Sequence, residues 1–162
     1  MVSTGNDTYG SAHLKRVILT RIEPNHDLLA ELEHLATNEG IKVGIILSGV
    51  GSLKECVLRN LRHFPKQFPI DDKSRLYKTI TGPLEILSLT GNIIETEDGQ
   101  LVVHAHISLS AVKGNEVITL GGHLVKGCLT YVMVEVVIGE LWKTKTKRKL
   151  NSERKALELS FS

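Results

Sequence analysis

The sequence predicts an α+β domain in which a mainly antiparallel sheet of about seven strands is packed by one main helix. One observation favours this class, and a second limits the number of domains. Short segments rich in Val, Ile and Leu recur along the chain, several with apolar residues at every second position, and only one segment shows the apolar spacing of a helix. In addition, 162 residues with 41% hydrophobic content are enough for one well-buried domain and too few for two comfortable ones.

Composition and charge narrow the possible function classes. Residues 1–12 are small and polar, which predicts a flexible N-terminal arm ahead of a single domain over residues 13–162. The formal charge of +2 argues against a surface built wholly for nucleic acid. Cys56 and Cys128 lack CxxC spacing, which predicts free thiols in an apolar core. No apolar run approaches the ~20 residues of a membrane span, and the start is too polar for a signal peptide, so we expect a cytoplasmic protein without membrane contacts.

The first third of the chain predicts one strand followed by the main helix. Residues 14–22, LKRVILTRI, combine alternation with β-branched side chains and predict a strand. The segment PNHD then signals a helix start, with Asn25 or Asp27 as the cap, and Gly40 ends the helix. Five residues share one apolar helical face: Leu28, Leu29, Leu32, Leu35 and Ala36.

Further strands are expected after the helix. Residues 41–53, an apolar run with three glycines, predict a buried strand that enters a tight turn, and residues 54–63 predict the next strand. A phosphate-binding loop is not favoured, because GVGSL lacks the lysine of that motif and no clear helix follows. Residues 64–75 contain two prolines and several charges, which indicates an exposed loop.

A hairpin is predicted around the Asp98-Gly99 turn. Residues 82–95, GPLEILSLTGNIIE, predict its first strand, in which Gly91 indicates a bulge. Glu85 stands among apolar neighbours, so it lies either on an exposed face or in a polar site. Farther along, residues 127–142 suit a central strand, and KALELSF suits a closing edge strand.

The stretch from Leu101 to Leu124 carries most of the recognisable chemistry. Residues 101–112 are predicted to form the second hairpin strand, and alternation places His104 and His106 on one face, opposite an apolar row. Two histidines at i and i+2 lie roughly 7 Å apart at Cα, so both imidazoles can reach one ion.

A third imidazole comes from His123. It follows Gly121 and Gly122, whose conformational freedom predicts a turn that brings His123 back towards the pair. Three neutral imidazoles with a fourth position open to water are typical of zinc and related divalent ions, so we expect one such metal here, preferably zinc. The alternative is a set of ordinary polar residues. Three buried rings without partners would cost on the order of 1–3 kcal/mol each, so some partner is expected.

Several segments together resemble a known family. GPLEILSLTGNI, the Asp98-Gly99 turn, HAHISLS, GGHL and VMVEVVIGEL are similar to the PPC domain, also called DUF296, over about Leu14 to Leu159. The resemblance implies an antiparallel sheet packed by a helix, and a homotrimer. The chain lacks the Arg-Gly-Arg-Pro AT-hook with which plant members grip the minor groove. Plant members also lack these histidines, so the resemblance implies a metal site of the single-domain prokaryotic type.

Two functions follow as hypotheses. The first is a metal-containing, homotrimeric DNA-binding or regulatory protein, with weak phosphate contacts from a basic run made of Lys143, Lys145, Lys147, Arg148 and Lys149. The same lysines would also suit a solvated edge strand that resists aggregation. The second is a metal-dependent enzyme, in which water at the open position ionises near neutral pH. It lacks a clear general base, since only Glu85 and Glu135 are carboxylates set in apolar strands.

Overall fold

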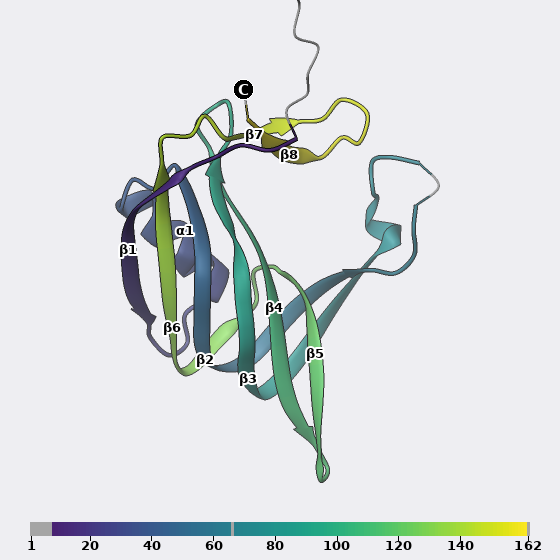
Figure 1. The fold of residues 1–162 in the computed structure, drawn as a ribbon. Helices are drawn as coiled ribbons and strands as arrows, with labels where there is room; N and C mark the ends of the chain where they lie inside the picture. Colours follow the sequence, from purple (N-terminus) through teal and green to yellow (C-terminus); the bar gives the residue numbers. More distant parts are fainter. Residues whose placement is uncertain (1–7, 66, 162) are drawn as a thin grey trace, which may run out of the picture.

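The computed structural model describes residues 8–65 and 67–161, and it confirms the α+β class. One α-helix and eight strands lie in these ranges (Figure 1). The elements in chain order are β1 (His13–Ile22), α1 (Leu28–Asn38), β2 (Val43–Leu61), the short 3-10 helix η1 (Asp72–Ser74), β3 (Arg75–Glu95), β4 (Leu101–Lys113), β5 (Glu116–Leu124), β6 (Leu129–Trp142), β7 (Lys147–Leu150) and β8 (Leu157–Ser160).

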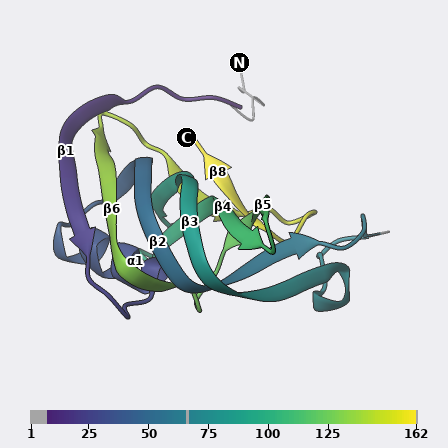
Figure 2. The same ribbon diagram turned by 90° about the horizontal axis from the view of Figure 1, so that it is seen from below.

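Six strands form one antiparallel sheet in the order β1-β6-β2-β3-β4-β5 (Figures 1 and 2). The far half of β2 also pairs with the end of β5, at Leu58 opposite Leu124 and Arg59 opposite His123. Strands β2, β3, β4 and β5 therefore close on themselves. The predicted closing strand near the C-terminus does not join this sheet, because β8 pairs only with β7 in a separate two-stranded sheet.

The glycine-rich region after the helix differs from the prediction. Instead of two strands and a tight turn, residues 43–61 form one long strand whose register shifts at three irregular points. Gly51 has a φ of 145°, and a Cβ there would lie 2.2 Å from the carbonyl oxygen of Met133. This glycine therefore allows β2 to approach β6 closely rather than to reverse.

Gly91 also has a role other than the predicted one. The bulge in β3 lies between Ile86 and Ser88, whereas Gly91 pairs regularly with Ala105. A Cβ at Gly91 would lie 2.3 Å from the carbonyl oxygen of His104. Only a residue without a side chain fits between the backbones of β3 and β4 at this point.

Helix α1 begins at the second of the two predicted caps. The Asp27 carboxylate accepts a hydrogen bond from the Ala30 amide at 2.9 Å. Its other oxygen accepts one from the Gly127 amide at 2.6 Å and one from the Cys128 amide at 3.2 Å. One carboxylate thus caps the helix and fixes it to the start of β6.

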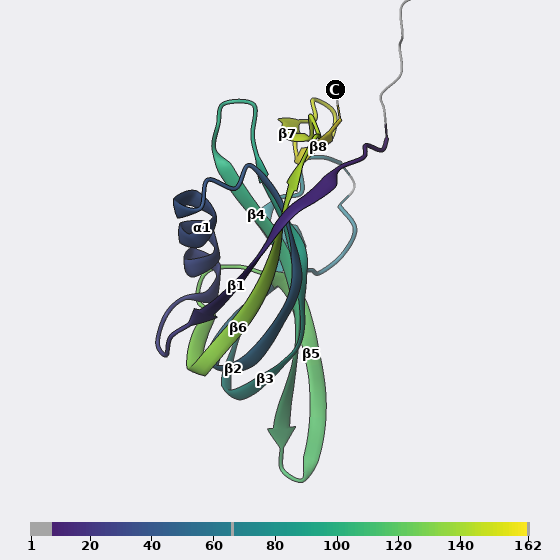
Figure 3. The same cartoon turned by 60° about the vertical axis from the view of Figure 1, so that its left-hand side comes forward.

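The core lies between α1 and one face of the sheet (Figure 3). It includes both cysteines, which are fully buried free thiols as predicted. The opposite face, called the outer face below, is covered by no helix of the described residues and exposes several apolar side chains: Val17, Leu19, Leu47 and Val50. The single described α-helix is too short to cross a membrane.

The two ends of the described chain lie close together. Of the predicted arm, residues 1–7 lie outside the described ranges, and residues 8–12 are exposed without regular structure. Gly10 nevertheless lies against Phe161, since a Cβ at Gly10 would be 2.6 Å from the Phe161 ring.

Candidate metal centre

Strand β4 places two histidines on the outer face, as alternation predicts. Ala105, Ile107 and Leu109 point into the core and are almost fully buried. His104 and His106 point the other way, where His104 is half-buried and His106 is exposed. The apolar row fixes the strand, and the strand fixes the separation of the two imidazoles.

His123 reaches the pair through strand register and not through the predicted glycine turn. The chain reverses at Gly114, which has a φ of 63°, and β5 then runs back along β4 until His123 lies opposite His106. The Gly121-Gly122 pair lies inside β5 and is needed for space. A Cβ at Gly121 would be 2.9 Å from a carbonyl oxygen of β4, and a Cβ at Gly122 would be 2.7 Å from the Asn60 amide.

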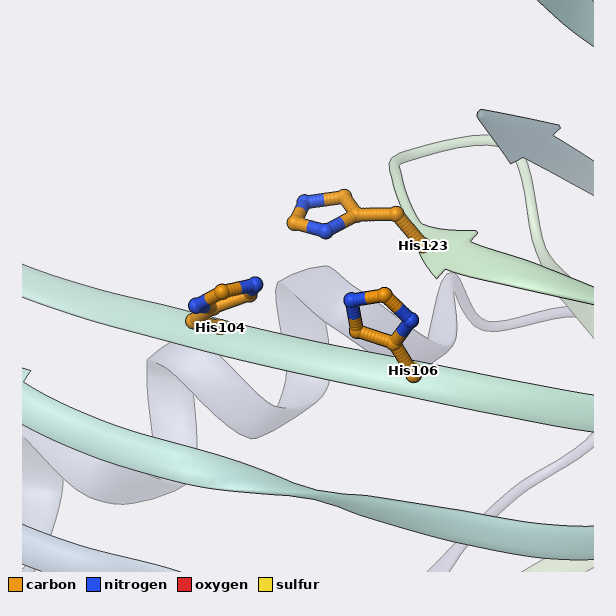
Figure 4. A group of neighbouring side chains, drawn as sticks. All are labelled: His104, His106 and His123. Atoms are coloured by element: carbon orange, nitrogen blue, oxygen red, sulfur yellow. The ribbon is translucent and has the colours of Figure 1, made fainter. Parts of the chain in front are cut away.

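The three imidazoles enclose a common space (Figure 4). The ring centroids of His104 and His123 are 4.9 Å apart, those of His106 and His123 are 5.2 Å apart, and those of His104 and His106 are 5.5 Å apart. One nitrogen from each ring lies within 4.8 Å of the others. Nitrogens around a tetrahedral zinc would be about 3.4 Å apart, so binding would draw the rings inwards.

Burial and neighbouring cations favour the neutral form of two of these rings, those of His104 and His123. Burial lowers the pKa of His123 to about 4, and the positive charge of Arg59 contributes to this shift. Burial also lowers the pKa of His104, with a further contribution from Arg148. Neutral imidazole is the form that binds a metal, so His104 and His123 are available as ligands at neutral pH.

Arg148 is the site neighbour that the sequence did not reveal. It was expected to contact phosphate from an exposed basic run, but it lies inward from β7 with only 5% of its surface exposed. One terminal nitrogen, Nη2, donates to Asn92 Oδ1 at 2.7 Å and to His104 Nδ1 at 3.2 Å. The other donates to the Leu157 carbonyl oxygen at 3.0 Å, while the buried Nε has no partner among the described residues.

The basic run is therefore much less available than its composition suggests. Lys147 is paired with Glu95, and Lys149 Nζ lies 3.1 Å from Glu97. A run of alternating Lys and Thr gives no sign of which side chain points inward. Arg148 points inward because β7 pairs with β8 and this hairpin packs on β3.

No carboxylate joins the three histidines in the described part of the chain. Glu85 is exposed and faces Ser110 on β4, well along the strand from His106. Glu135 on β6 lies opposite Arg21 on β1, near the edge of the sheet that is remote from β4 and β5. Neither of the carboxylates considered from the sequence lies in the site.

The comparisons with known proteins agree with the fold. The model of the Plants and Prokaryotes Conserved (PCC) domain matches residues 9–142. The chain belongs to this family. PCC is the family that was named PPC above on the basis of sequence motifs. A plant- and prokaryote-conserved protein of Pyrococcus horikoshii is 31% identical, with a TM-score of 0.74 and coverage of 92% of this chain and 94% of that one.

Other PCC-like relatives add context. A metal-containing protein of Archaeoglobus fulgidus has the same fold, with 24% identity, a TM-score of 0.72, and coverage of 94% of this chain and 97% of that one. The bifunctional protein GlmU of Synechococcus sp. (strain JA-3-3Ab) is 33% identical over 144 residues. This alignment covers 89% of the chain but only 20% of that relative, so the chain spans about a fifth of its length.

Proposed function

We propose that this PCC protein is a homotrimeric binding protein for a divalent metal, preferably zinc, held by His104, His106 and His123. The observation that carries the proposal is the convergence of three imidazoles on one space. Three nitrogen ligands with an open fourth position are a common zinc arrangement. The Archaeoglobus relative, described as metal-containing, supports the same assignment.

The homotrimer is supported by the outer face of the sheet. Leu19 is 78% exposed, Val50 is 54% exposed, and both line one open hollow together with Val137. An apolar sheet face that no helix covers favours association with other copies of the chain. The histidine site lies on this same face of the sheet, so association would also affect access to the metal.

DNA binding belongs to this proposal only as a weak, salt-sensitive interaction. Proteins of Bacteroides thetaiotaomicron and Ralstonia eutropha with the same fold are described as putative DNA-binding proteins. In this chain Lys143 and Lys145 remain exposed, whereas Arg148 is buried beside the histidines. Few cations of the basic run therefore remain free, so any contacts with phosphate would be weak and would be lost as the salt concentration rises.

An enzymatic role is less well supported by the site. A hydrolytic metal centre requires a group that moves protons within hydrogen-bond reach of the reacting atoms. The described carboxylates do not provide one, since none joins the histidine group. The arrangement of the site therefore favours binding over acid–base catalysis.

Metal analysis tests the proposal directly. The protein would be loaded with zinc, dialysed and measured by mass spectrometry next to the His106→Ala variant. We expect about one zinc per wild-type chain and strong depletion in the variant. His34→Ala is the matched control, because His34 is an exposed helical residue whose ring forms a hydrogen bond with Asn38. Equal zinc in wild type and His106→Ala would refute the proposal.

A further inference from the structure

We propose that the metal centre binds a small oxyanion, with a carboxylate or phosphate group as the remaining ligand and Arg59 and Arg148 as its anchors. The inference depends on the proposed metal site and adds the chemical class of its ligand. Three features support it: a guanidinium beside each side of the centre, a histidine lone pair for which metal and Arg148 compete, and a local excess of positive charge.

Arg59 flanks the centre from strand β2. Across the closed part of the sheet, His106 lies opposite His123, and His123 lies opposite Arg59. Directly opposite residues share a face and have Cβ atoms about 4.5–5.5 Å apart, so these three side chains form a row. Arg59 is half-buried, and within the described ranges its guanidinium makes no hydrogen bond or ion pair with a protein group. A half-buried guanidinium without an acceptor suits an external anion.

Arg148 flanks the centre from the side of His104. A guanidinium can only donate, so His104 Nδ1 uses its lone pair to accept from Nη2, and its proton lies on Nε2. A metal bound through Nδ1 would take that lone pair. A metal bound through Nε2 would move the proton to Nδ1, which could then no longer accept. In both cases metal binding ends the contact between Arg148 and His104.

The released guanidinium needs a new acceptor. Only 5% of the Arg148 surface is exposed, and its Nε already lacks a partner among the described residues. A buried charged donor that loses a hydrogen bond carries a large desolvation penalty. An oxyanion placed beside the metal would provide acceptors for Nε and Nη2 together, in the bidentate geometry that guanidinium groups favour.

Charge balance favours the same ligand class. A divalent ion on three neutral imidazoles, next to Arg59 and Arg148, carries a formal charge of +4 from the +2 ion and the two guanidinium groups. No described carboxylate joins the group to offset it. Positive charges interact strongly in a half-buried site, so an anionic fourth ligand lowers the electrostatic energy more than a neutral one.

The test uses the whole protein loaded with cobalt(II), whose visible spectrum reports a change of ligand. Inorganic phosphate and malonate are the two probes, and they separate a phosphate preference from a carboxylate preference. Each would be titrated into wild type, Arg59→Gln, Arg148→Gln and the control Arg154→Gln. Arg154 lies between β7 and β8 and pairs with Glu158. Cobalt affinity would be measured separately by competition with a chelator.

We expect at least one anion to change the cobalt spectrum and to bind about tenfold more weakly, or worse, in Arg59→Gln. Arg148→Gln should weaken the anion similarly while binding cobalt at least as tightly as wild type, because a competitor for His104 is gone. If Arg148→Gln does not fold, Arg59→Gln decides. Cobalt binding without an anion response, or with equal anion affinity in Arg59→Gln, would overturn this inference alone. Failure to bind cobalt at all, seen before any anion is added, would overturn the proposed metal site as well.

Discussion

His106 and His123 lie directly opposite each other on β4 and β5, with ring centroids 5.2 Å apart and ring planes at 83°. Strand register alone creates this pair, because each histidine belongs to a different strand of one hairpin. The separation of the two backbones is therefore fixed by strand pairing and does not depend on the metal, whereas the rings can still move towards an ion.

A double-variant cycle tests whether this pair serves one ion. We expect His106→Ala and His123→Ala each to weaken zinc binding by more than about a hundredfold, since loss of a ligand exceeds the 10–100-fold cost of losing a supporting residue. The double variant should lose little more than either single variant, because both rings bind the same ion. Competition with a chromophoric chelator measures these affinities. Additive losses would indicate two independent sites.

Metal retention should extend to more acidic pH than for ordinary histidines. Protons compete with metal for imidazole, and the pKa of His123 is lowered to about 4 while that of His104 is also lowered. His123 therefore remains largely neutral in the folded protein down to about pH 4, and His104 also resists protonation, so acid should displace zinc over a lower range than the usual pKa near 6.5 suggests. Zinc release during an acid titration, followed with an indicator, would measure the midpoint. Arg59→Gln should move the midpoint to higher pH.

Glu140 should make stability depend on pH through a separate site. This carboxylate on β6 is 6% exposed and accepts hydrogen bonds from Lys15 at 2.8 Å and from Arg16 at 2.5 Å. Burial acts to raise its pKa, but the two hydrogen bonds outweigh burial and lower it from 4.5. The folded state therefore holds its proton less tightly than the unfolded state, and the stabilisation present above about pH 4.5 is lost as pH falls through the folded pKa.

Glu140→Gln should consequently lower the free energy of unfolding by about 1–2 kcal/mol at pH 7, the scale of hydrogen bonds to a charged group. The deficit should shrink as pH falls below 4. Urea unfolding at several pH values checks this. A deficit that stayed constant down to pH 3 would show that the carboxylate charge is not responsible. Glu116→Gln, at an exposed position in β5, is the control.

Gly91→Ala should disturb both stability and metal binding. The added Cβ would lie 2.3 Å from the His104 carbonyl oxygen, so β3 and β4 must separate at this point. Overpacking of this kind costs about 1–3 kcal/mol, and the displaced His104 should bind metal less tightly. Thermal unfolding and zinc competition measure the two effects. Thr79→Ala, at an exposed position of β3, should change neither.

Leu19→Glu should disrupt the proposed trimer and leave the fold intact. Leu19 is 78% exposed on the outer face, so the chain does not need this side chain for its own core. A charge buried between copies would oppose association. Sedimentation velocity should show a trimer for wild type and a smaller species for the variant, with unchanged circular dichroism. A wild-type monomer at micromolar concentration would rule out the trimer.

Local patterns were sufficient for much of this structure. The period of two in residues 101–112 predicted which face carries His104 and His106, and the apolar spacing after Asp27 predicted α1. Both signals depend only on residues close together in the chain, and each element follows its pattern to within a residue or two.

Long-range pairing accounts for the errors. The glycines at 51, 91, 121 and 122 looked like turns or bulges, because the sequence shows only that a glycine backbone can adopt many conformations. It does not show the atoms of neighbouring strands that leave no room for a side chain at these positions. Arg148 looked like a surface cation for the same reason. Its contact with His104 joins residues 44 positions apart and exists only because the β7–β8 hairpin lies over β3.

That hairpin lies beyond residues 9–142, the part of the chain that the PCC family model matches. The three histidines are inside the matched part, whereas Arg148 comes from outside it. A change in this short C-terminal segment would therefore replace the neighbour of His104 without altering the three histidines or the sheet that holds them.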